Sequence, residues 1–105
     1  MLNFTLKQLR YVEAAGRLGS IAGAASKLNI SQSSITAAID VLEAELGYDL
    51  FLRTPAKGIH PTSAGFETLK LIRSYLDQTL HFEADLLSVG GAETGFVKLA
   101  CYSTA

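Results

Sequence analysis

The residues whose types and spacing are best suited to recognising a ligand lie close together, between residues 31 and 37. They carry hydroxyl, amide and methyl groups: Ser31, Gln32, Ser33, Ser34, Thr36 and Ala37. In the major groove of DNA an amide bonds adenine, a hydroxyl donates to or accepts from a base, and a methyl meets the thymine methyl. This run therefore predicts contact with base edges.

Groups suited to holding phosphate lie on either side of this run. Lys27 precedes it, and Arg53 and Lys57 follow it. Residues 28–52 contain no Lys or Arg but four acids: Asp40, Glu43, Glu45 and Asp49. Phosphate contacts supply much of the affinity for DNA and need not come from the segment that reads the bases. We expect the three cations to hold the DNA backbone.

Ser20 and Ser31 complete the predicted DNA-binding set, because each is placed to begin a helix. Unpaired N–H groups at a helix start attract phosphate without any side-chain charge. Each predicted contact also has a simpler role, since a serine here can act only as a cap and a lysine or arginine only as a solvated charge. We expect Ser31 to cap, with DNA contact in addition, and Asp40 to be a solvated charge rather than an acceptor for cytosine.

Catalytic and metal-binding groups are sparse. His60, His81 and Cys101 are too scattered to indicate a zinc site. No glycine-rich phosphate loop follows a strand, and no serine, histidine and aspartate form the setting of an activated nucleophile. The sequence predicts no enzyme activity, no cofactor and no metal.

The composition is typical of a small globular protein. The chain has 105 residues, 49% of them hydrophobic, and a net charge of −1, which argues weakly against nucleic acid. The single cysteine cannot form an internal disulfide, and the sequence has neither the apolar run of a signal peptide nor one long enough to span a bilayer. We expect a cytoplasmic protein without membrane contact.

Apolar spacing and capping residues predict three helices that would position the reading run. The first covers residues 6–16 and begins with a capping box at Thr5 and Gln8. The second covers 21–28 after the N-cap Ser20, and the third covers 32–46 after the N-cap Ser31. Only about three residues separate the last two helices, which is typical of a helix-turn-helix.

A short hairpin and a long helix are predicted to follow. Residues 50–53 and 59–61 flank a turn and form a wing. A fourth helix over 63–89 would be roughly 40 Å long, too long to bury its apolar stripe on this small domain. We expect that stripe to pair with a second copy: Phe66, Leu69, Ile72, Leu76, Leu80 and Leu87. Residues 97–102 look like a strand with nothing to pair with.

Many residues at fixed spacing together resemble the LysR-type transcriptional regulators: Ser20, Ala24-Ala25, Leu28, Ser31-Gln32, Ile39, Leu42-Glu43, Leu46-Gly47, Leu50-Phe51, Arg53 and Thr62-x-Ala64-Gly65. The resemblance implies a mainly α protein with a winged helix-turn-helix DNA-binding domain over 1–62. It also implies a linker helix over 63–90 that makes a homodimer. Residues 91–105 would then start a C-terminal ligand-binding domain that this chain lacks.

Members of that family regulate transcription. The resemblance implies double-stranded DNA as the partner, a higher oligomer in the full-length protein, and a small-molecule co-inducer bound only by the missing domain. In this reading residues 32–46 enter the major groove and residues 53–60 reach the phosphate backbone or the minor groove. An alternative is a dimerisation or protein-interaction domain with little DNA affinity, since Ala37, Ala38 and Asp40 replace long polar side chains that are common in the family.

Overall fold

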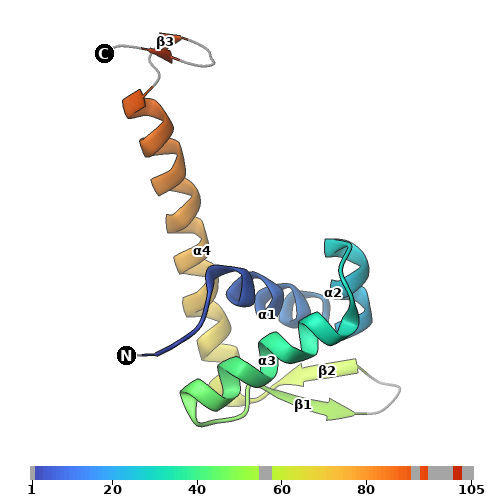
Figure 1. Cartoon of the computed structure of the whole chain (residues 1–105). Coiled ribbons are helices and arrows are strands. Elements are labelled where there is room, and N and C mark those ends of the chain that lie inside the picture. Colours follow the sequence, from blue (N-terminus) through green and yellow to red (C-terminus); the bar gives the residue numbers. More distant parts are fainter. Residues whose placement is uncertain (1, 55–57, 91–92, 95–100, 103–105) are drawn as a thin grey trace. The chain divides into compact units, whose positions relative to one another are not determined.

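The computed structural model describes residues 2–54, 58–90, 93–94 and 101–102 (Figure 1). It divides into two compact units, Met1–Arg73 and Ser74–Ala105. Along the described chain the elements are α1 (Leu6–Leu18), α2 (Ile21–Leu28), α3 (Gln32–Leu46), β1 (Phe51–Thr54), β2 (Gly58–Pro61), α4 (Ser63–Gly90), β3 (Glu93–Thr94) and β4 (Cys101–Tyr102). The fold is mainly helical, with a winged helix-turn-helix in the first unit, as the sequence predicts.

Local capping explains where α1 begins and ends. The Thr5 hydroxyl accepts from the Gln8 N–H at 3.1 Å, and the Gln8 side chain accepts from the Thr5 N–H at 2.8 Å, so the capping box is present. The predicted end at residue 16 is wrong, because α1 continues to Leu18. Gly19 is the residue that ends the helix, in the left-handed conformation at φ 66°.

The helix-turn-helix forms at the predicted residues. Asn29 ends α2 in the left-handed conformation, and the Ser31 hydroxyl accepts from the Ser34 N–H at 3.2 Å to begin α3. The core beneath this turn is formed by small side chains of α2 and large ones of α3, with α1 packed against both. Its buried side chains include Val12, Ala15, Ala24, Ala25, Ile35, Ile39 and Leu42.

The wing is an antiparallel pair in which Phe51 lies opposite Pro61 and Thr54 opposite Gly58. Phe51 and Ile59 are buried, so the hairpin belongs to the core of the first unit. The Ile59 N–H also donates to the Gly19 carbonyl at 3.2 Å. This bond holds β2 beside the turn between α1 and α2.

The first turns of α4 also belong to the core of the first unit. The Thr62 hydroxyl accepts from the Gly65 N–H at 2.9 Å and donates to the Asp49 carbonyl at 2.7 Å. The Tyr48 and Thr68 hydroxyls are 2.6 Å apart. This part of the helix is therefore fixed to the segment that joins α3 to β1.

Leu69 and Ile72 do not match the expected partner-facing stripe, because both are buried within the first unit. Leu69 packs directly on Gly16 of α1: a Cβ added at Gly16 would lie only 2.6 Å from Leu69 Cδ1. Apolar spacing along α4 identified the right kind of residue but could not distinguish a core neighbour from a partner.

Part of the C-terminal segment is described only as backbone. β3 and β4 pair antiparallel, with Glu93 opposite Tyr102 and Thr94 opposite Cys101. The expected strand over 97–102 without a partner is therefore wrong at Cys101 and Tyr102, while residues 97–100 lie outside the described residues.

Candidate nucleic-acid interface

The first turns of α3 present a neutral, exposed face. Gln32, Ser33 and Ala37 are exposed, and Thr36 is half-buried. The opposite face carries Ile35, Ala38, Ile39 and Leu42, which are fully buried. The core thus fixes the rotation of α3 and turns the predicted base-reading side chains outward.

The serines at the start of α3 form a small hydroxyl cluster. The Ser31 hydroxyl lies 3.0 Å from that of Ser33 and 2.9 Å from that of Ser34. It also accepts from the Ser34 N–H, so capping and side-chain bonding occur together. These three contacts use the one donor and both acceptor lone pairs of Ser31, whereas the Ser33 and Ser34 hydroxyls keep capacity to bond outward.

The start of α2 lies beside the wing. The Ser20 hydroxyl accepts from the Gly23 N–H at 2.8 Å, which caps the helix. A shallow hollow of about 410 Å³ separates this helix start from the hairpin. It is lined by Ser20, Ile21, Ala22, Arg53, Thr54, Gly58 and Ile59. The predicted residues Ser20 and Arg53 therefore share one surface depression.

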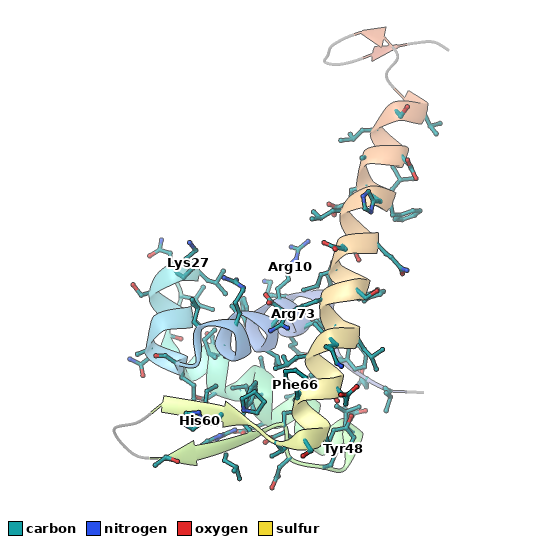
Figure 2. The ribbon with its side chains drawn as sticks, turned by 180° about the vertical axis from the view of Figure 1, so that it is seen from behind. Arg10, Lys27, Tyr48, His60, Phe66 and Arg73 are labelled. Atoms are coloured by element: carbon teal, nitrogen blue, oxygen red, sulfur yellow. The ribbon has the colours of Figure 1, made fainter. Side chains whose placement is uncertain are left out.

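Two further cations were predicted to bind phosphate. Lys27 is exposed in the last turn of α2 (Figure 2). Lys57 lies outside the described residues. The structure therefore gives a position to Lys27, Arg53 and the neutral residues of the predicted DNA-binding set.

Arg53 is already paired, which its sequence position did not indicate. Its Nη2 donates to Asp40 Oδ1 at 2.9 Å and lies 3.5 Å from Glu43 Oε1. Both carboxylates come from α3. Asp40 is exposed, as expected of a solvated charge, but it is also ion-paired and links α3 to the wing.

Glu43 also holds the segment that leads into the wing. Its Oε2 accepts from the Leu50 N–H at 2.7 Å and from the Phe51 N–H at 3.4 Å. Sequence reasoning missed this role, because the two amides lie seven and eight positions further along the chain. The carboxylate fixes the direction in which β1 leaves α3, and thus the place of the wing.

We expect Glu43→Ala to lower the free energy of unfolding by about 1–3 kcal/mol, because the amide of buried Leu50 would lose its acceptor. Glu43→Gln should cost less, since it keeps one acceptor oxygen. Urea unfolding followed by circular dichroism measures both variants. Equal stability of Glu43→Ala and the unmodified chain would contradict the role.

A second ion-pair cluster connects α1 to the base of α4. Glu13 Oε2 lies 3.2 Å from Arg17 Nε and 3.3 Å from Arg73 Nε. The Glu13 side chain is only 13% exposed, whereas those of Arg17 and Arg73 are about half exposed. Glu13 therefore links α1 to the third turn of α4.

The predicted dimerisation residues fall into two groups. Leu69 and Ile72 are buried in the first unit, whereas Phe66, Leu80 and Leu87 are more than half exposed and Leu76 is half-buried. A second exposed stripe was missed: Leu71, Tyr75, Phe82, Leu86 and Val89. At 100° per residue its members fall within about 60° of the helix circumference, so the spacing alone could have identified it.

Two kinds of feature are absent from the described part of the chain. No helix there combines the length and the apolar character that crossing a membrane requires. The same residues contain no group of three or more histidines, cysteines or acids that could hold a metal ion.

The family model and the similar curated proteins all describe helix-turn-helix regulators. A family described as bacterial regulatory helix-turn-helix protein, lysR family, matches residues 6–66. The chain is 38% identical over 104 residues to the HTH-type transcriptional regulator CbbR of Rhizobium meliloti (strain 1021), covering 99% of this chain and 33% of that protein. It is 37% identical over 98 residues to the regulator ClcR of Pseudomonas putida, covering 93% of this chain and 33% of that protein.

A solved structure is also similar. The crystal structure of the CbnR_DBD–DNA complex matches with a TM-score of 0.74 and 34% identity, covering 78% of this chain and 93% of that one. By contrast, the chain spans about a third of the length of the curated relatives it matches.

Proposed function

Because the chain belongs to the lysR family of bacterial regulatory helix-turn-helix proteins, we propose that it binds double-stranded DNA as a homodimer and regulates transcription. The observation that carries this proposal is the exposed neutral face at the start of α3, in a fold similar to a DNA-bound relative. In this proposal α3 enters the major groove, where recognition helices contact bases mainly with their N-terminal residues.

The charges around α3 suggest that different residues contact the bases and the phosphates. Gln32, Ser33, Thr36 and Ala37 face the base edges, with Ser31 and Ser34 at the helix start. The N–H groups at the starts of α2 and α3 attract phosphate, and Lys27 adds a charge beside them. Lys57 would act from the wing. Neutral residues thus supply sequence discrimination, while the helix starts and the cations supply affinity.

Homodimerisation through α4 is supported by the exposed stripe that was missed in the sequence. Two antiparallel copies centred between residues 78 and 79 would place Leu71 opposite Leu86 and Tyr75 opposite Phe82. At 100° per residue, Leu80 and Leu87 point about 130–150° away from the centre of this stripe, so they lie outside this interface.

We also propose a binding role without catalysis, in the cytoplasm where bacterial DNA is accessible. Residues 1–62 would form the DNA-binding domain and 63–90 the linker helix. Residues 91–105 would lead into a further domain that takes a small-molecule co-inducer and supports a higher oligomer. The greater length of the curated relatives supports this last part.

A salt titration of DNA binding tests the proposal against an interaction domain with little DNA affinity. A protein held by several phosphates loses affinity steeply with salt, with a slope of about −0.9 per contacted phosphate. We expect measurable binding of the 105-residue chain to duplex DNA at low salt and a slope of several units. No binding even at low salt would overturn the proposed function in favour of the alternative.

Gln32→Ala and Lys27→Ala should affect binding in different ways. Gln32→Ala is expected to cost about 1–3 kcal/mol on a selected sequence, to relax preference at one base pair, and to leave the salt slope unchanged. Lys27→Ala should weaken binding to all sequences alike and reduce the slope by about one. Fluorescence anisotropy at several salt concentrations distinguishes the two. Identical behaviour of both variants would contradict the division of labour.

A further inference from the structure

Arg53, Asp40 and Glu43 form a cluster that is not a phosphate site as it stands. The guanidinium contributes one positive charge and the two carboxylates contribute two negative charges, so the cluster has a net charge of −1. A DNA phosphate that approached Arg53 here would also approach Asp40, whose side chain is 59% exposed. The positive charge of Arg53, which the sequence predicts as a phosphate contact, is therefore already neutralised by the two carboxylates.

The two carboxylates hold Arg53 in different ways. Glu43 is engaged by the Leu50 and Phe51 amides, and its distance to Arg53 Nη2 is the longer one, 3.5 Å. Asp40 makes the short charge-assisted hydrogen bond of 2.9 Å to the same nitrogen. Asp40 is thus the residue that directs the guanidinium toward α3.

The ion pair with Arg53 also explains how an acidic residue can occupy the outward face of α3. It lies two turns from the start of α3, on the same side of the helix as Ser33 and Ala37. An unpaired carboxylate there would repel the DNA backbone. Pairing with Arg53 removes that repulsion, but it also uses the charge of Arg53.

We propose that Asp40 is a positioning residue that keeps the Arg53 guanidinium on the recognition helix and withholds it from phosphate. The inference rests on the proposed DNA binding of this domain. Its consequence is that the first strand of the wing adds no net phosphate contact. Affinity for arbitrary DNA, which is almost entirely electrostatic, is thereby kept lower than the number of cations would suggest.

The test uses the 105-residue chain, a duplex selected from a random pool by that chain, and a shuffled duplex of equal length and composition. Asp40→Asn is expected to raise affinity for both duplexes by about three- to tenfold and to steepen the salt slope by about 0.9, the value of one phosphate contact. Arg53→Ala in the unmodified chain should leave the slope nearly unchanged. In the Asp40→Asn background, Arg53→Ala should remove the added slope.

Asp49→Asn is the matched control, because Asp49 is exposed and the change removes the same charge. Equal gains from Asp40→Asn and Asp49→Asn would overturn the inference by showing only a general charge effect. A loss of one unit of slope on Arg53→Ala in the unmodified chain would overturn it too. Both outcomes leave the proposed function standing, whereas no binding by the unmodified chain at low salt overturns the two together.

Discussion

Phe82→Glu is expected to convert the proposed homodimer into a monomer. Phe82 is 61% exposed on α4 and lies in the stripe that we assign to the partner copy. Two glutamates would enter each dimer and remove two aromatic contacts, each costing about 2 kcal/mol or more at a central position. Together these losses of about 4 kcal/mol raise the dimer dissociation constant roughly a thousandfold. Sedimentation equilibrium of the 105-residue chain measures the change directly.

The loss of the dimer should also weaken DNA binding, because two linked recognition helices bind two half-sites far more tightly than one binds a single half-site. Ala84→Glu is the control, since Ala84 is exposed on the opposite side of α4 and receives the same charge. This variant should remain dimeric. A dimeric Phe82→Glu, or equal dissociation of both variants, would contradict the assigned interface.

Point substitutions serve this test better than truncation. A chain ending at residue 66 would lose Leu69 and Ile72, which belong to the core of the first unit. Its failure to dimerise would then reflect an incomplete core as readily as a missing interface.

Gly65→Ala is expected to lower the free energy of unfolding by about 3 kcal/mol or more. A Cβ at Gly65 would collide with the Leu50 carbonyl oxygen and would also lie against the Leu50 carbonyl carbon and Cα. These atoms are backbone, and the same carbonyl accepts from the Thr62 N–H at 2.9 Å. The start of α4 would have to move away from Leu50, which disturbs the cap at Thr62 as well.

Gly90→Ala is the control for this prediction, because Gly90 lies at the other end of α4 and a Cβ there meets nothing within 4 Å. We expect that change to be neutral or stabilising by a few tenths of a kcal/mol, since alanine is the better helix former. Thermal unfolding monitored by circular dichroism compares the two variants. Similar melting temperatures for both variants would contradict the prediction, because they would show that a side chain at position 65 is accommodated beside Leu50 without loss of stability.

The helices of the first unit illustrate what local sequence determines. α2 and α3 have their predicted bounds, and Ser20 and Ser31 make the predicted N-caps. These features depend on bonds between residues at most four positions apart. The error at the end of α1 has a different cause. Gly16 lies within the helix beside Leu69, a distant residue of α4, and Gly19 is the residue that ends the helix.

The candidate site was only partly predictable. The outward face of α3 follows from its apolar spacing, so the neutral reading residues could be named from the sequence. The state of Arg53 could not, because its partners Asp40 and Glu43 lie ten or more positions earlier in the chain. Only the packing of the wing on α3 brings these charges together.

The sequence by itself determined the helices, the turn between α2 and α3, the wing and the family to which the chain belongs. Those properties depend on capping residues, glycines and apolar spacing, whose effects extend over only a few residues. The tertiary structure alone decided that Leu69 and Ile72 are core, that Leu71 and Phe82 are exposed, and that Asp40 holds Arg53. An apolar period predicts that one face of a helix is buried, and a charged residue predicts an ion pair. Neither pattern identifies the distant segment that covers the face or pairs with the charge.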